Sequence, residues 1–348
     1  MNDANDATPD RGTTASEPES EAALGSAASP GSEVVRGSGG AAGRKPRRHR
    51  KASSPARSRL EYQGLSALLS WIRSVPVERA ARRMAALVGA GYWLSPRLRR
   101  IGTGNLQRAF PDRDDAWRKE TLQEVFRNLG RMAAEVAWFE DLRPGNIRER
   151  VHFLSDADER TWRGYAASGR PGILVSGHFG NWELLAQAAG LIGTPIHIVH
   201  RPLRNPLVDD LLNRVRSRAG TDVIYKHAAA REILRLLQRG ETIAIPIDQH
   251  APGAQGVPVP FFGRPASTTL GPARFAARQR IPLMMAVLVR RGTTLQHDVR
   301  LCPPIDPPSG RDEAALVETM ARVNLAFEGI VREHPEQWLW VHRRWRLD

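Results

Sequence analysis

Residues 172–183 read GILVSGHFGNWE, and this stretch carries the strongest signal for both the fold and the chemistry. Its first five residues are a short apolar run bounded by glycines, which is typical of a buried strand. Asn181 is suited to cap a helix, and the residues after it are good helix formers. The pattern therefore predicts a strand, a loop and a helix start, with His178 on the loop and Glu183 in the first helical turn.

His178 and Glu183 are the predicted catalytic pair. A carboxylate in the first turn of a helix is favoured by the helix dipole and can reach back toward an imidazole. A histidine oriented in this way can act as a general base and take a proton from a hydroxyl group. The bare His-x4-Glu spacing also fits a structural histidine with a surface glutamate behind it. The spacing alone therefore does not establish a catalytic pair, and its context in the rest of the chain is needed.

Strands and helices alternate along most of residues 99–348, the predicted catalytic domain. Strands are expected at 172–176, 195–200, 222–225, 242–247, 283–289 and 296–301. Helices are expected at 116–142, 181–191, 206–219, 228–239, 267–279 and 312–334. This alternation predicts an α/β domain with a mixed, largely parallel sheet flanked by helices. Because ligands gather at the carboxyl edge of such sheets, we expect His178, Arg201 and Asp248, which all follow predicted strands, to converge there.

Several other residues are candidates for substrate binding. Arg201 could clamp a phosphate or carboxylate with both arms of its guanidinium group, although a surface arginine more often makes a salt bridge. Asp248 could orient an arginine or a histidine. Phe261 and Phe262 could wall a site for a fatty chain or belong to the core.

The expected start of helix 267–279 is a further candidate. Thr268 and Thr269 lie there, and their hydroxyls with the neighbouring amides would suit an anion such as phosphate. A structural cap without a ligand explains the same residues equally well.

The formal net charge of +14 predicts an anionic partner or surface. Residues 1–59 contain almost no large apolar residues, so we expect them to be disordered, with a basic part at 44–59. No aromatic residues are interleaved in this basic part, which favours an anionic membrane over nucleic acid. A solvated basic tail is the alternative.

Residues 60–98 are the predicted membrane-associating segment. They contain an apolar helical face around Leu68 and an uncharged run at 84–94. Neither reaches the ~20 apolar residues needed to cross a bilayer, so an amphipathic helical anchor at the interface is expected. An ordinary amphipathic helix packed on the domain is the competing interpretation. The polar amino terminus does not read as a signal peptide, which predicts a cytoplasmic position for the folded part.

Other kinds of chemistry have little support in the sequence. Cys302 is the only cysteine, which excludes a disulfide within the chain and a cysteine-rich metal site. There is no P-loop, no dinucleotide-binding glycine motif after a strand and no His-Glu-x-x-His, so we expect neither a metal nor a cofactor. Ser176 is a possible nucleophile, but it lacks the Gly-x-Ser-x-Gly elbow.

Taken together, the blocks of this sequence resemble the lysophospholipid acyltransferase superfamily, in particular its branch of bacterial lipid A biosynthesis acyltransferases. The resemblance covers about residues 60–348. It is carried by the blocks at 105–111, 177–183, 200–202, 248–249, 260–263, 268–269 and 338–345. The glycerolipid branch usually has Asp at the position of Glu183, so the glutamate points to the lipid A branch.

This resemblance implies a reaction and a set of partners. A fatty acyl group would pass from an acyl carrier protein or acyl-CoA thioester to a hydroxyl of an anionic glycolipid, a lipid A precursor. His178 would be the base, and Arg201 and Asp248 would complete the site. The other expected contacts to substrate are Asn181, Phe261, Phe262, Thr268 and Thr269. The enzyme would work at the cytoplasmic face of the inner membrane, peripherally or through a single amino-terminal anchor.

Three other functions remain open at this point. The acceptor could be another lipid, such as a phosphatidylinositol mannoside. The chain could instead be a non-enzymatic basic protein that binds a membrane or nucleic acid through residues 44–59. It could also be a lipid hydrolase that uses Ser176 as its nucleophile.

Overall fold

In this computed structural model, the described residues are 54–200, 202–225 and 229–346. Most of the predicted disordered tail and Arg201 lie outside them. The first helix begins at Pro55, five residues before the expected start of the folded part at residue 60. Residues 55–59, which we expected to be disordered, therefore belong to a helix.

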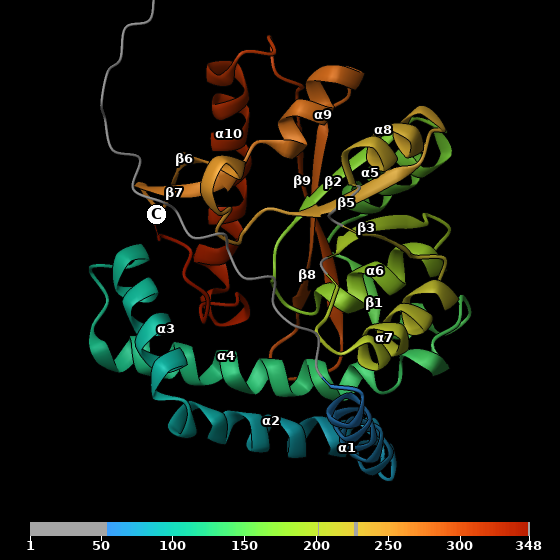
Figure 1. Cartoon of the computed structure of the whole chain (residues 1–348), viewed down its shortest axis with the longest axis vertical. Helices are drawn as coiled ribbons and strands as arrows, with labels where there is room; N and C mark the ends of the chain where they lie inside the picture. Colours follow the sequence, from blue (N-terminus) through green and yellow to red (C-terminus); the bar gives the residue numbers. More distant parts are fainter. Residues whose placement is uncertain (1–53, 201, 226–228, 347–348) are drawn as a thin grey trace, which may run out of the picture. The chain divides into compact units, whose positions relative to one another are not determined.

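A seven-stranded sheet forms the centre of the folded part (Figure 1). Its strand order is β1-β9-β8-β2-β5-β3-β4. The pairing of β8 with β9 is antiparallel, and all the other pairings in this sheet are parallel. The prediction of an α/β fold with a mixed, largely parallel sheet is therefore confirmed. Its strands are β1 (Val151–Phe153), β2 (Gly172–Ser176), β3 (Ile196–His200), β4 (Asp222–Tyr225), β5 (Thr242–Pro246), β8 (Leu283–Arg290) and β9 (His297–Ile305).

The central strands are apolar because helices cover both faces of the sheet, which leaves no solvent-facing side. All eight residues of β8 are buried. Residues from α8, α9 and α10 complete the core on one face, and residues from α5 and α6 complete it on the other. These five helices are α5 (Asp156–Ala167), α6 (Trp182–Leu191), α8 (Ala229–Gln238), α9 (Gly271–Gln279) and α10 (Glu313–Glu333). A further helix, α7 (Pro206–Arg218), contacts the edge strand β4.

A separate hairpin corrects one expectation. Strands β6 (Gly256–Phe261) and β7 (Arg264–Thr269) pair antiparallel, and Pro260 lies opposite Pro265 next to the turn. The predicted helix at 267–279 therefore begins only at Gly271, and its first residues belong to β7. The prolines and the threonines obscured the alternation from which a strand is normally recognised.

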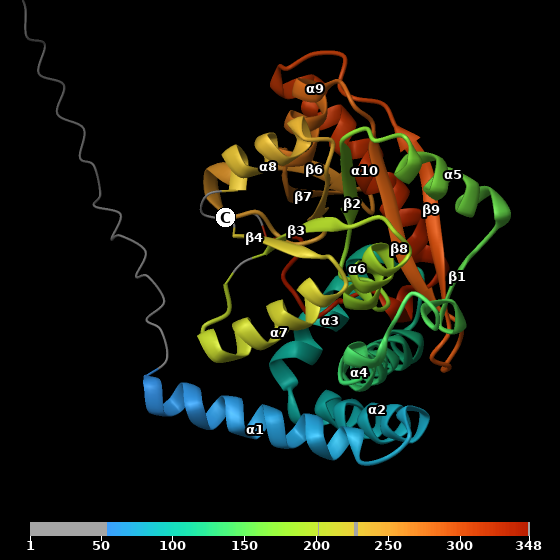
Figure 2. The same ribbon diagram turned by 90° about the vertical axis from the view of Figure 1, so that its right-hand side faces the viewer.

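Four helices precede the sheet in sequence: α1 (Pro55–Arg73), α2 (Val77–Leu94), α3 (Pro96–Ala109) and α4 (Asp115–Val136). Of these, α1, α2 and α4 lie below the sheet in Figures 1 and 2. One face of α2 packs on α4 through small residues, and a Cβ atom at Gly130 would lie 2.2 Å from the carbonyl oxygen of Met84. The predicted segment at 60–98 is therefore built from parts of three helices, and all three contact the domain: α1 contacts α7, and α2 and α3 contact α4.

The same helices leave large apolar side chains in solvent. The most exposed are Leu60, Trp71, Leu87, Trp93 and Leu94. Within the described ranges, no helix combines the length and the apolar character that crossing a bilayer requires.

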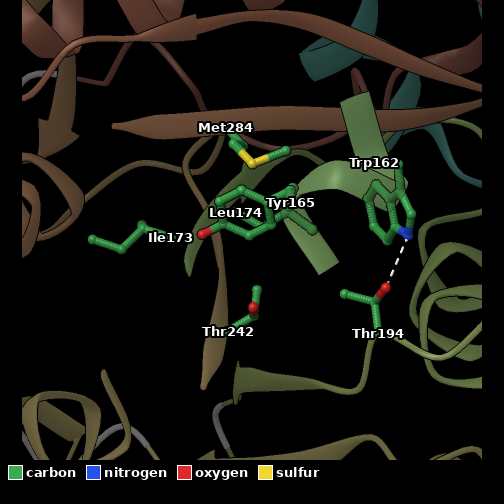
Figure 3. A pocket seen from close by; sticks show the side chains of 7 residues that line it. All are labelled: Trp162, Tyr165, Ile173, Leu174, Thr194, Thr242 and Met284. Carbon is green, nitrogen blue, oxygen red and sulfur yellow. Dashed lines mark hydrogen bonds between the residues drawn. The ribbon is translucent and has the colours of Figure 1, made fainter. Parts of the chain in front are cut away.

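A small apolar cavity lies between α5 and the sheet (Figure 3). Its volume is about 10 Å³, which is room for about one water molecule. Trp162 donates a hydrogen bond of 3.0 Å to the hydroxyl of Thr194 beside it, and burial raises the pKa of Tyr165 to about 12. Ile173 and Thr242 line it near the amino ends of β2 and β5. It is too small for a substrate and lies away from the carboxyl edge of these strands.

Candidate active site

His178 and Asp248 meet at the carboxyl ends of two neighbouring parallel strands. Ser176 of β2 is in register with Pro246 of β5, and each candidate lies two residues further along. The Nδ1 atom of His178 lies 2.9 Å from Oδ1 of Asp248. The backbone N–H of His178 donates to Oδ2 of the same carboxylate, at 2.8 Å. Asp248 therefore fixes both the backbone and the ring of the histidine.

The loop that carries His178 depends on two glycines. A Cβ atom at Gly177 would lie 2.3 Å from the ring of Phe327, and one at Gly180 would lie 1.8 Å from the carbonyl oxygen of Leu288. Gly180 also has a φ of 55°, which is unfavourable for residues with a Cβ atom. These positions exclude larger residues and let the loop pass closely between β8 and α10.

The segment at residues 335–345, which we call the carboxyl-terminal strap, closes over this pair. The indole N–H of Trp338 donates to Oδ2 of Asp248 at 2.9 Å. The backbone N–H of Leu339 donates to the carbonyl oxygen of His178 at 3.0 Å. Nε2 of His342 lies 2.8 Å from the carbonyl oxygen of Asp248. The strap therefore holds both members of the pair, a role that the sequence did not reveal.

The electrostatics of the pair suit a base. Burial of the imidazole favours its neutral form, but the charge and hydrogen bond of Asp248, with a smaller contribution from Glu183, outweigh this and raise the pKa of His178. Burial also opposes the charge of Asp248, yet His178 and Trp338 are among the groups that hold its pKa well below its ordinary value. The Asp248 side chain is fully buried, whereas that of His178 is 23% exposed. A proton on Nδ1 directed at the carboxylate leaves the lone pair on Nε2.

Glu183 does not make the contact that we expected. Its carboxylate is bound by Arg216 of α7, with Nε 3.0 Å from Oε2 and Nη2 2.6 Å from Oε1. No hydrogen bond joins Glu183 to His178 in the described part of the chain, and Asp248 orients the ring instead. The physical reason is that Arg216 is buried, and an unpaired buried guanidinium group would be costly.

Other predicted binding residues form the frame of the site. Phe261 is buried among Trp338, Trp345 and Phe327, so the core interpretation describes it, and Phe262 is also buried. The hydroxyl of Thr268 is fully buried, donating to Ala266 and accepting from Arg344. Thr269 accepts a hydrogen bond from the backbone of Gly271 at 3.2 Å. The protein's own groups thus engage the hydroxyl of Thr268, and the hydroxyl of Thr269 accepts from the backbone at the start of α9.

Asn181 is also buried, and it joins the loop to a charged network. Its side-chain oxygen caps α6 by accepting from Leu184, and its amide donates to Glu135 at 2.9 Å. Glu135 also binds Arg290 at 2.5 Å and His297 at 2.6 Å. Burial alone would raise the pKa of Glu135, but its two partners lower it to about 2. Because Glu135 lies in an ordinary amphipathic pattern, nothing in the sequence marked it.

The hydroxyl of Ser176 donates to the carbonyl oxygen of Ala286 at 2.8 Å, which engages it within the sheet. Among the described residues, no group of three or more His, Cys, Asp or Glu side chains is arranged to hold a metal ion.

Comparisons with known proteins place the chain in one family. Residues 52–347 match the family model for bacterial lipid A biosynthesis acyltransferases. A lipid A biosynthesis acyltransferase of Haemophilus influenzae is 27% identical, over 74% of this chain and 83% of its own length. The lipid A biosynthesis palmitoleoyltransferase of Escherichia coli is 27% identical over 71% of this chain and 78% of its own length. The lauroyltransferase of the same organism is 28% identical over 70% of this chain and 77% of its own length.

Proposed function

Because the chain belongs to the bacterial lipid A biosynthesis acyltransferase family, we propose that it transfers a fatty acyl group from a thioester donor to a hydroxyl of a lipid A precursor. Family membership makes the chain an O-acyltransferase. The observation that carries the mechanism is the 2.9 Å contact between Nδ1 of His178 and Asp248. It leaves Nε2 as the basic atom of a ring that is partly open to solvent.

In the proposed reaction, Nε2 of His178 takes the proton from the acceptor hydroxyl as its oxygen attacks the thioester carbonyl carbon. A new C–O bond forms, and the carbonyl oxygen becomes an oxyanion. The intermediate then collapses, the C–S bond breaks, and the thiolate leaves with the proton that His178 carries. Asp248 stabilises the imidazolium during these steps and keeps its ring in place. The donor is an acyl carrier protein or acyl-CoA, and both supply the same thioester.

Glu183 and Arg201 have supporting roles in this proposal. Glu183, held by Arg216, adds negative charge that makes His178 more basic without touching its ring. In the sequence, Arg201 comes directly after His200, the last residue of β3, and β3 is the strand next to β5. We propose that Arg201 pairs with a phosphate of the acceptor or with the oxyanion.

We further propose that the helices before the sheet rest on the cytoplasmic face of the inner membrane. Leu87 and Leu94 are 56% and 81% exposed, and they lie seven residues apart on one face of α2. Exposed arginines, including Arg97 and Arg100, are next to them in sequence. Apolar side chains beside cations match an anionic bilayer surface.

One assay tests the reaction directly. Purified protein would be incubated with a tetra-acylated lipid A precursor and acyl donors of varied length, and the products would be read by mass. The His178→Ala variant should be slower by about 10²–10⁴-fold, the range for losing a general base. Normal turnover by this variant would overturn the assignment of His178. Acylation of a phosphatidylinositol mannoside in place of the lipid A precursor would instead reassign the acceptor.

A further inference from the structure

A second cavity opens beside the end of α3, and of its lining residues only Phe262 is among those predicted for the His178 site. Its volume is about 870 Å³. Three segments that are far apart in sequence form its walls: the connection from α3 to α4, the turn between β6 and β7, and the last turn of α10. They bring together four arginines, Arg108, Arg113, Arg264 and Arg332.

Positive charge is in excess around this cavity. Arg332 is paired with Glu328, whose Oε1 lies 2.6 Å from Nη2. Asp112 is the one acidic side chain of the lining. Within the described residues, no carboxylate forms a salt bridge with the other three arginines, Arg108, Arg113 and Arg264. The protein thus leaves most of the cationic charge of the cavity unneutralised.

Aromatic rings restrict the orientation of two of these guanidinium groups before any ligand binds. Arg332 lies over the ring of Phe262, 4.6 Å from its centroid, and 5.7 Å from that of Phe110. Arg113 lies over Trp117 at 5.3 Å. A guanidinium group stacked on a ring keeps its N–H groups pointing outward in its own plane. Less conformational freedom is then lost when an anion binds.

The turn at the cavity rim is strained. Phe262 has a φ of 52°, a left-handed conformation that is unfavourable for a bulky L-residue. The turn is held by a hydrogen bond of 2.6 Å from the backbone N–H of Phe262 to Glu328, the same carboxylate that binds Arg332. Strain of this kind is typical of functional sites. Here it keeps the Phe262 ring under Arg332 and places Arg264 at the rim.

A series of packed aromatic rings connects the cavity to the catalytic pair. Phe262 packs on Phe261, with centroids 4.9 Å apart, and Phe261 packs on Trp338 at 5.4 Å. Trp338 in turn binds Asp248. A ligand held at the arginines would therefore sit on the same rigid aromatic frame as the base.

We propose that this cavity is a subsite for a phosphate group carried by one of the two substrates. Guanidinium groups bind phosphate through paired hydrogen bonds, and a concave site suits a small anionic group better than a protein surface. The phosphate belongs to the phosphorylated sugar headgroup of the acceptor or to the nucleotide part of CoA. This subsite would belong to the proposed acyl transfer. It depends on that proposed function only for which substrate carries the phosphate.

Binding of inorganic pyrophosphate to the full chain tests the cavity without reference to activity. Titration calorimetry at low and moderate salt should show binding that weakens as salt is added. The Arg108→Ala/Arg264→Ala variant should bind at least about tenfold more weakly, because two charged hydrogen-bond donors are lost. Arg278→Ala, which removes an exposed charge at the far end of α9, is the matched control and should bind normally. If the double variant unfolds at a lower temperature than the wild type, the single Arg264→Gln variant replaces it.

Kinetics of the same variants identify the carrier. A rise in KM for the phosphorylated acceptor, but not for its dephosphorylated form, places the acceptor phosphate in the cavity. A rise in KM for acyl-CoA alone places the nucleotide there. Equal pyrophosphate binding by the double variant, or unchanged KM values for both substrates, would overturn the proposal. So would a rise in KM only for a carrier-protein donor, which indicates a docking surface. Absence of any acyl transfer would contradict the proposed function, while the pyrophosphate titration would still decide this inference.

Discussion

The Nδ1 atom of His178 lies 2.9 Å from Oδ1 of Asp248, a residue 70 positions further along the chain. The same carboxylate accepts hydrogen bonds from the backbone of His178 and from the indole of Trp338. An acid with this many partners stays ionised and cannot rotate away from the ring. The pair therefore has the arrangement that a general base needs. In the proposed mechanism Glu183, which is nearer to His178 in sequence, acts only through its charge.

Replacing Asp248 by Asn should lower kcat/KM by about 10²–10⁴-fold, because the ring loses the group that orients it and stabilises its charge. Product formation measured by mass would check this. Asp306→Asn, at an exposed position after β9, is the control and should be normal. A folded Asp248→Asn protein with more than a tenth of the wild-type rate would contradict the role.

The pH dependence follows from the raised pKa of His178. The base must be neutral, so kcat/KM should fall as the pH drops, with a midpoint above the ordinary value of 6.5. Glu183→Gln removes a negative charge that favours the imidazolium, so the midpoint should move to lower pH. A wild-type midpoint below 6.5 would contradict this account.

Trp338→Phe tests the strap. The change keeps an aromatic ring in the buried position but removes the donor to Asp248, so kcat should fall about tenfold with little change in KM. Trp340→Phe is a matched control, since Trp340 is equally buried in the same segment and donates to Pro335 instead. Equal losses in the two variants would show that only packing matters.

Much of this fold could be predicted from sequence, because the strands β2 and β4 have the expected bounds and β5 and β8 end within one residue of them. Their apolar runs are short and lie between clear turn signals. The hairpin of β6 and β7 was missed because its pattern is interrupted by prolines at positions 258, 260 and 265. The short edge strand β1 has only three residues, too few to show a period.

The site was less predictable than the fold. His178 and Asp248 could both be named as residues that follow strands. The contact between them could not be predicted, since it depends on which strands are neighbours in the sheet. The sequence predicts that Glu183 contacts His178, the nearest histidine along the chain. In the structure Glu183 instead binds the buried guanidinium group of Arg216, which belongs to α7. Sequence spacing reveals local partners, but partners from other elements follow only from the tertiary fold.

Glu135→Gln should reduce stability in a pH-dependent way. The folded pKa of about 2 lies below the ordinary 4.5, so the ionised group stabilises the protein above pH 4.5, and this contribution is lost as the pH falls toward 2. The shift corresponds to about 3 kcal/mol at neutral pH. Urea unfolding at pH 7 should show the variant to be less stable, with a smaller difference at pH 3. Glu120→Gln, exposed on the same helix, should have little effect at either pH.

The membrane proposal makes a prediction about α2. Leu87→Glu/Leu94→Glu should lower binding to vesicles that contain anionic lipid by at least about tenfold, because two apolar side chains no longer enter the interface. Co-sedimentation measures this directly. Leu325→Glu changes a residue of α10 that is 68% exposed, and it should bind as the wild type does. If all three proteins bind vesicles equally, the surface of α2 is not the attachment site.

The register between Ser176 and Pro246 has a consequence for how such enzymes can diversify. Neighbouring strands are held about 4.8 Å apart by backbone hydrogen bonds, whatever side chains they carry. The spacing of β2 and β5 in the sheet thus sets the distance between His178 and Asp248. Between these two strands the chain passes through α6, β3, α7, β4 and α8 before it returns to the sheet in β5. Loops in this stretch are free to be exchanged between relatives, so chimeras that swap them should change substrate preference and leave the proton-transfer apparatus intact.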